Sequence, residues 1–234
     1  MGDMCFPDRQ LAIRHATLAD LEDITTVAQD GFPDDPEFNY RFPYRHDFPD
    51  DNRKWVREEY REYLSQPDKY AVVVATASEN HDKPVALSVW DIAVQTAHRG
   101  GDLGVPDNRS LEPRRRDVNA AHFREFKNRM DEGFAKYFSK HGSDQIHLWL
   151  LCTRPAFRRR GAGTSLCQWG LGYAARAGIR HATVLASPMG KLLYQEVGFV
   201  LNGSFFVGPV EGDDEDEKLE IWALTSYVLG EGSE

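Results

Sequence analysis

Residues 158–163 form the basic, glycine-containing stretch Arg158-Arg159-Arg160-Gly161-Ala162-Gly163, which decides the fold. The apolar run 146–152 precedes it and the helix-like segment 164–177 follows it, so the pattern predicts a strand, a tight turn and a helix. The glycines lack a Cβ, which permits positive φ angles and lets a ligand approach the backbone. Free N–H groups at the start of the helix and three arginines then favour an anion, most naturally a phosphate. The alternative is a surface turn with solvated arginines.

The composition indicates an ordinary globular protein. The chain has 234 residues, is 41% hydrophobic and carries a formal net charge of −9. This charge argues against nucleic-acid binding, which needs a basic face, and suits a cationic substrate. Cys5, Cys152 and Cys167 are an odd number without metal-like spacing, so we expect reduced thiols, no metal and a cytoplasmic location. No segment approaches the ~18 apolar residues of a membrane span, so we expect no membrane partner. We expect the protein to be a monomer or a homodimer.

The remaining pattern predicts one α/β (α+β) domain over residues 1–234, with helices flanking a mostly antiparallel sheet of about seven strands. Strands are predicted at 11–16, 70–77, 84–93, 146–153, 182–186, 199–207 and 218–227. Helices are predicted at 17–31, 53–66, 118–140, 164–177 and 187–198. Residues 32–51 are expected to be a loop, and 94–141 an insertion that ends in the long helix. Arg114 to Arg116, within this insertion, are expected to be solvated. The acidic segment 211–217 is expected to join the last two strands as a hairpin.

A second motif, Leu193-Tyr194-Gln195-Glu196-Val197-Gly198-Phe199, follows the basic turn. With Pro155 and the turn itself, it resembles the GCN5-related N-acetyltransferase (GNAT) superfamily. The match is to that family's P-x-x-(Q/R)-x-x-G-x-(G/A) pyrophosphate loop and to its later L-Y-x-x-x-G-F helix. The resemblance is close over residues 146–200, and elsewhere it extends to the order of elements. It implies a mixed sheet that splays between its fourth and fifth strands.

The resemblance also implies acetyl-coenzyme A (acetyl-CoA) as co-substrate and acyl transfer to an amine by direct attack. Arg158 stands at the Q/R position of the loop. The residues whose backbone N–H groups would hold the pyrophosphate are Arg159, Arg160, Gly161, Ala162, Gly163 and Thr164. The N–H of Leu151 would bond the thioester oxygen, where negative charge develops, and Thr153 would pair with pantetheine. Ser187 stands where the family often carries asparagine and is a further coenzyme candidate, expected also to cap the next helix.

Three residues are candidates for the proton transfers. Tyr194 matches the family tyrosine that protonates the departing thiolate, a role that suits a phenol at neutral pH; the alternative is a packed aromatic. His147 is four residues before Leu151, so a period of two places both side chains on one face, and imidazole is a base near neutrality. The alternative is that His147 lines the groove or bonds within the core. Asp91, on the neighbouring strand, is the rival base, and water chains are a third possibility. Cys152 is expected to be a buried small side chain rather than a nucleophile.

The acceptor site is expected beside residues 32–44, because that region commonly borders it in the family. Its aromatic side chains and carboxylates suit an amine, although they also suit an ordinary packed loop. The leading function is therefore an N-acetyltransferase for a small-molecule amine. The alternatives are a protein lysine or N-terminal acetyltransferase, and a non-catalytic coenzyme A-binding regulatory protein.

Overall fold

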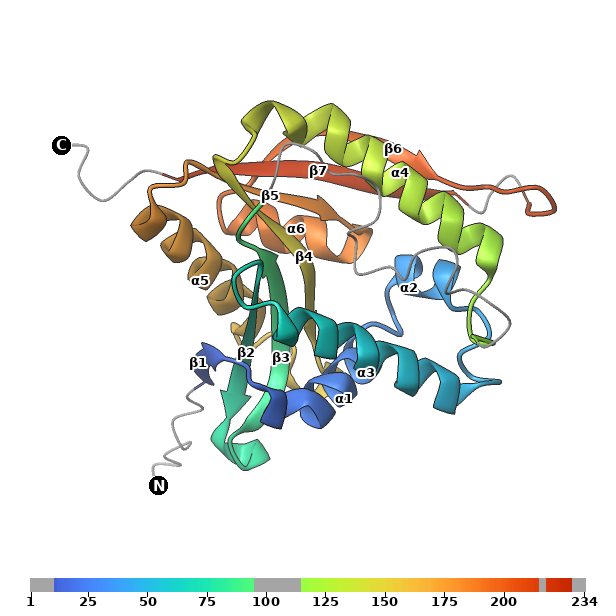
Figure 1. Cartoon of the computed structure of the whole chain (residues 1–234), viewed down its shortest axis with the longest axis horizontal. Helices are drawn as coiled ribbons and strands as arrows, with labels where there is room; N and C mark the ends of the chain where they lie inside the picture. Colours follow the sequence, from blue (N-terminus) through green and yellow to red (C-terminus); the bar gives the residue numbers. More distant parts are fainter. Residues whose placement is uncertain (1–10, 95–114, 215–217, 229–234) are drawn as a thin grey trace, which may run out of the picture.

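A seven-stranded sheet in the order β1-β2-β3-β4-β5-β7-β6 runs through the molecule (Figure 1). The computed structural model describes residues 11–94, 115–214 and 218–228. The strands are β1 (Leu11–His15), β2 (Tyr70–Ala77), β3 (Lys83–Asp91), β4 (Gln145–Thr153), β5 (His181–Ala186), β6 (Val200–Val207) and β7 (Leu219–Tyr227). Only the β4–β5 pair is parallel, so the predicted mixed, mostly antiparallel sheet is confirmed.

The sheet opens between β4 and β5, as the family resemblance implied. Their pairing runs from Gln145 to Leu148, opposite His181 to Val184, whereas β4 continues to Thr153. On its other side β4 stays paired with β3, but the register shifts there and leaves Trp149 as an extra residue, a β-bulge. In the second half of β4, one backbone edge therefore has no strand beside it among the described residues.

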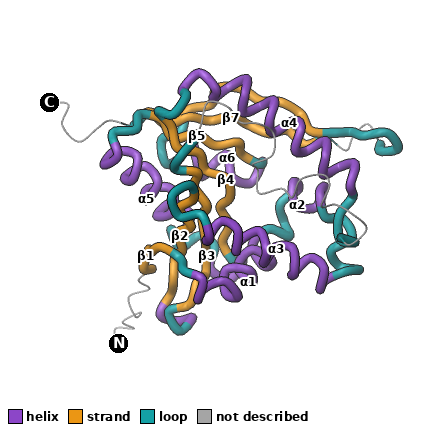
Figure 2. The backbone as a smooth tube through the Cα atoms, viewed as in Figure 1, coloured by secondary structure: helices purple, strands orange, loops and turns teal. Residues whose placement is uncertain are grey.

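Helices cover both faces of this sheet, as the tube view shows (Figure 2). They are α1 (Leu21–Gly31), α2 (Pro36–Arg41), α3 (Pro49–Ser65), α4 (Ala120–Phe138), α5 (Ala162–Ala177) and α6 (Pro188–Glu196). On one face, α5 and α6 share a core with Ile146 and Leu148 of β4. On the other face, α1 and α3 pack against β2 and β3, and α4 packs against β5 and β7. Successive strand residues alternate between these two cores because side chains alternate across a strand.

The prediction that residues 32–51 form a loop is wrong, because this segment contains α2 and the first turn of α3. Asp35 caps α2 by accepting a hydrogen bond from the Glu37 N–H at 2.9 Å, with Pro36 in the first helical position. Pro49 likewise begins α3, four residues before the expected start. Each helix begins with a proline whose missing N–H would have no partner there. The proline content that indicated a loop is therefore the start signal of two helices.

Part of the predicted insertion is also packed rather than solvated. The Arg115 side chain is 5% exposed and pairs with buried Asp117 at 2.9 Å, and Arg116 pairs with Asp51 at 2.8 Å. The prediction that this arginine cluster is solvated is therefore wrong for Arg115. Residues 95–114, with Arg114, lie outside the described residues, as do Cys5 and 215–217 of the acidic loop. None of the helices in the described ranges has the length and apolar character that a bilayer span requires.

Candidate active site

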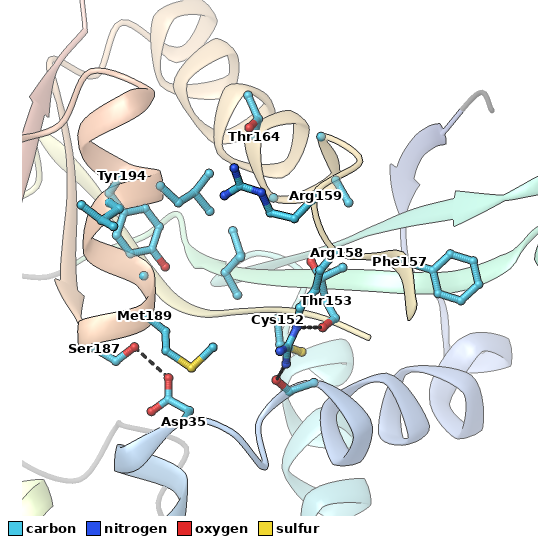
Figure 3. A pocket seen from close by; sticks show the side chains of 18 of the residues that line it. Asp35, Cys152, Thr153, Phe157, Arg158, Arg159, Thr164, Ser187, Met189 and Tyr194 are labelled. Atoms are coloured by element: carbon cyan, nitrogen blue, oxygen red, sulfur yellow. Dashed lines mark hydrogen bonds between the residues drawn. The ribbon is translucent and has the colours of Figure 1, made fainter. Parts of the chain in front are cut away.

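A pocket of about 470 Å³ lies where β4 leaves β5 (Figure 3). Its walls are the end of β4, the first turn of α5, helix α6, and the segment that joins α1 to α2. The predicted site residues that line it are Leu151, Thr153, Arg158, Arg159, Gly161, Ala162, Gly163, Thr164, Ser187 and Tyr194. The structure thus brings most of the expected coenzyme contacts and the expected proton donor to a single cavity.

The basic turn, residues 158–163, has the backbone of an anion site. Arg159 and Gly161 both have left-handed φ angles, 61° and 87°, immediately before α5 begins at Ala162. Successive N–H groups in such a turn form a concave site for anions, and those of the first helical turn lack intrahelical partners. A Cβ on Gly163 would lie 2.9 Å from Leu193 Cδ2, so this glycine lets α6 approach the turn closely. The local geometry fits a pyrophosphate.

The three arginines of the turn differ in their partners. Arg158 is bound to Thr153, Gly31 and Asp34. Arg160 pairs with Glu79, is not among the pocket-lining residues, and donates to the Ala156 carbonyl at 2.8 Å. Arg159 has no hydrogen-bond or ion-pair partner among the described residues, and it lines the pocket. Its guanidinium is therefore available to an anionic ligand.

Tyr194 lies on α6, and its hydroxyl points into the pocket (Figure 3). The side chain is 6% exposed, and this burial raises the pKa of the phenol well above its usual value. A Cβ on Gly190 would lie 2.7 Å from Tyr194 Cε2, so a glycine one turn earlier leaves room for the ring. The phenol therefore stays protonated at neutral pH and is able to donate a proton.

His147 and Asp91 lie outside this pocket. His147 is 1% exposed, its Nδ1 lies 2.8 Å from Thr183 Oγ1, and its ring contacts Phe134 of α4 edge to face. Asp91 stands opposite His147 in the β3–β4 register and accepts a hydrogen bond from the Ala93 N–H at 3.0 Å.

The expectation that His147 and Leu151 share a face is wrong. The bulge at Trp149 inverts the alternation between them, so His147 faces α4 and Leu151 packs with the α5 core.

Cys152 lines the pocket but is buried and poorly suited to nucleophilic attack. Its thiol donates weakly to the Val27 carbonyl, with a sulfur–oxygen distance of 3.8 Å. Burial raises the pKa of this thiol well above its usual value, so little thiolate forms at neutral pH. Among the described residues, no group of three or more histidine, cysteine, aspartate or glutamate side chains is arranged to hold a metal ion.

Two carboxylates beside the pocket were not singled out from the sequence. Asp35 lines the cavity and accepts a hydrogen bond from the Ser187 hydroxyl at 2.7 Å (Figure 3). Ser187 is the N-cap residue of α6, as expected, but its hydroxyl makes no capping hydrogen bond to the helix. In Glu37, Oε1 is buried and has no hydrogen-bond partner among the described residues. Burial, with the nearby charge of Asp35, raises the pKa of Glu37 to about 8. The Asp35-Pro36 cap and proline pair is the sequence signal that would have placed both residues on an ordered element.

Comparisons with known proteins agree with this geometry. Residues 119–208 match the family model "Acetyltransferase (GNAT) domain". A comparison with curated proteins finds no match.

Three solved structures share the fold. A Corynebacterium glutamicum protein described as "histone acetyltransferase HPA2 and related acetyltransferase" is 20% identical, with a TM-score of 0.61 over 94% of this chain and 97% of that one. A Drosophila melanogaster polyamine N-acetyltransferase is 12% identical, with a TM-score of 0.64 over 93% and 100%. The PaiA N-acetyltransferase of Thermoplasma acidophilum, in complex with coenzyme A, is 12% identical, with a TM-score of 0.50 over 93% and 99%.

At these identities the likeness to solved structures shows a common fold, while the family match covers the segment that contains β4, the basic turn and α6. Residues 119–208 thus match a GNAT acetyltransferase domain model, and the chain as a whole shares its fold with solved N-acetyltransferases.

Proposed function

We propose that the protein transfers the acetyl group of acetyl-CoA to the primary amine of a small molecule by direct attack. The observation that carries this proposal is the convergence of three features on one cavity. These features are an anion-favouring turn at the start of α5, a protonated phenol at Tyr194, and a carboxylate at Asp35. Together they supply a site for the coenzyme, a proton donor and a proton acceptor.

The coenzyme fits along the opening of the sheet. Its pyrophosphate would be held by backbone N–H groups from Arg159 to Thr164 and by the unpaired Arg159 guanidinium. The pantetheine arm would run beside the open edge of β4, where Thr153, whose carbonyl also accepts from Arg158, is the proposed strand-like partner. The N–H of Leu151 would then bond the thioester oxygen, which gains negative charge in the transition state.

Acetyl-CoA supplies an acyl group activated as a thioester. The neutral amine nitrogen forms a bond to the carbonyl carbon, and the carbon–sulfur bond breaks. One proton leaves the amine and one reaches the departing sulfur. Tyr194 is the proposed donor to sulfur, because burial keeps its hydroxyl protonated and it faces the cavity.

Asp35 is the proposed proton acceptor, in place of His147 or Asp91. It lines the same cavity as Tyr194, and the Ser187 hydroxyl holds its carboxylate in a fixed orientation. His147 and Asp91 are both about 1% exposed within the core beneath α4 and are not among the residues that line the cavity. A proton acceptor must reach the amine directly or through one water, which favours Asp35.

The acceptor wall favours a small cationic amine. Phe32 and Asp35 both line the cavity, so an aromatic face and a carboxylate lie close together. Such a wall attracts an ammonium group by cation–π contact and by charge. The Drosophila protein of the same fold is named for polyamine acetylation and forms N-acetylagmatine, which agrees with this class.

A thiol-release assay tests the proposal. Wild-type protein is mixed with acetyl-CoA and, in parallel, with polyamines, arylalkylamines, lysine-containing peptides or water alone. We expect release with small amines and little with peptides. Preferred release with peptides would instead indicate the protein acetyltransferase. Coenzyme A binding without release across the whole panel would contradict catalysis and favour the regulatory protein.

A further inference from the structure

Arg158 donates hydrogen bonds to three acceptors from different parts of the chain. Its Nε donates to the Thr153 carbonyl at 3.2 Å (Figure 3). Its Nη2 donates to the Gly31 carbonyl at 3.0 Å, and Nη1 to the Asp34 carboxylate at 2.7 Å. These acceptors lie at the end of β4, the end of α1 and the start of the next segment. Because its forked donors are fixed by these partners, Arg158 would have to break several bonds to reach a phosphate.

Arg159, the next residue, differs from Arg158 in conformation and in contacts. Its φ of 61° is left-handed, which costs a residue with a Cβ about 1–2 kcal/mol and is typical of functional sites. The side chain is exposed, lines the cavity and has no partner among the described residues. Its conformation therefore directs an uncommitted positive charge toward the cavity.

Two of the three acceptors of Arg158, Gly31 and Asp34, belong to the crossing segment, residues 31–35, which passes beside the cavity from α1 to α2. Gly31, Phe32 and Asp35 of this segment line the cavity. Its far end is bound to α6 through the Ser187–Asp35 hydrogen bond at 2.7 Å. Its near end lies tightly against β4, where a Cβ on Gly31 would be 3.0 Å from Cys152 Cβ. The crossing segment is therefore held from both walls of the cavity.

We propose that Arg158 is a positioning residue that couples the basic turn to the crossing segment, whereas Arg159 supplies the guanidinium that contacts the coenzyme phosphates. The turn that binds the phosphates thereby also sets the position of Asp35 and Phe32 through one side chain. Because this role of the crossing segment rests on the proposed acetyl transfer, its test includes measurements that need no turnover.

Measurements of coenzyme A affinity distinguish the roles of the two arginines. By calorimetry, Arg159→Gln is expected to weaken coenzyme A binding about tenfold or more and to reduce its salt dependence, because a charge-assisted hydrogen bond is lost. Arg158→Gln is expected to stay within about twofold of wild type. Arg176→Gln removes the same charge at an exposed position in the last turn of α5 and serves as the matched control.

Amide hydrogen exchange and amine kinetics measure how each variant affects the crossing segment. Arg158→Gln is expected to speed amide exchange in residues 31–35 and, at saturating acetyl-CoA, to raise the amine KM or lower kcat about tenfold. Asp34→Asn removes the negative charge from one of the three acceptors and should act in the same direction more weakly. Arg159→Gln and Arg176→Gln should leave exchange in this segment unchanged. Arg158→Lys keeps the charge but has one terminal nitrogen, so it should resemble Arg158→Gln and replaces it if that variant does not fold.

The proposal is overturned if Arg158→Gln weakens coenzyme A binding as much as Arg159→Gln, or if exchange in residues 31–35 does not change. It is equally overturned if Arg159→Gln binds coenzyme A as wild type does. If the wild-type protein acetylates no amine, the proposed function fails, while binding and exchange still decide the roles of the two arginines.

Discussion

The first four residues of β4 pair with β5, and His147 and Leu148 among them also pair with β3, whereas from Trp149 onward β3 is its single strand partner in the described part of the chain. The first half carries His147, which is closed in by Thr183 and by aromatic side chains. The second half carries Leu151 and Thr153, which line the cavity. Strand pairing, rather than the chemistry of the side chains, therefore decides which half of β4 is available to a ligand.

The largest expected effect is that of Tyr194→Phe, which tests the cavity beside the open half of β4. Loss of a positioned general acid typically costs about 100-fold or more in rate, so kcat should fall by at least that factor while the coenzyme A Kd stays unchanged. Steady-state kinetics with the preferred amine, together with calorimetry, measure both quantities. Tyr227→Phe, at an exposed position on β7, is the control and should match wild type. Full activity of Tyr194→Phe would remove the phenol from the mechanism.

Gly170→Ala and Gly163→Ala compare the closed core with the cavity. A Cβ on Gly170 would meet the fully buried Trp90 ring at 2.2 Å, so the alanine should lower the free energy of unfolding by about 1–3 kcal/mol. A Cβ on Gly163 would meet the movable end of Leu193, so stability should change less and the coenzyme A Kd should rise severalfold. Denaturant unfolding and calorimetry measure the pair. Equal losses of stability would contradict the distinction.

Glu37→Gln tests the buried carboxylate through pH. Burial holds the pKa of Glu37 in the folded protein at about 8, above its usual value of 4.5, so the stability contributed by protonated Glu37 is full below pH 4.5 and is lost as pH rises through 8. The glutamine does not titrate. The melting temperature of the Glu37→Gln variant relative to that of wild type should therefore increase between pH 5 and pH 9, by an amount equivalent to roughly 1–3 kcal/mol. A difference that is constant with pH would show that Glu37 is solvated.

Much of the fold was predictable because hydrophobic periodicity is local. The seven strands, the basic turn and the helix that carries Tyr194 are predicted from the sequence alone. The bulge at Trp149 was not predictable, because one extra residue leaves the apolar pattern of β4 intact while it inverts every later side chain. Helix α2 was missed because Pro36 was interpreted as a breaker rather than as a first helical residue. The bulge bears on the proposed role of His147, because it places His147 and Leu151 on opposite faces, and α2 bears on that of Asp35, because Asp35 caps this helix.

The pH dependence of kcat/KM for the amine, measured side by side for wild type, Asp35→Asn and His147→Gln at saturating acetyl-CoA, tests the central claim most directly. With Asp35 as acceptor, the bound ammonium loses its proton within the site. The Asp35→Asn variant must instead bind the rare neutral amine, so its rate should fall about 100-fold near pH 7 and rise about tenfold per pH unit up to the pKa of the amine. His147→Gln should keep the wild-type profile. A wild-type profile in Asp35→Asn and a steep one in His147→Gln would contradict the account.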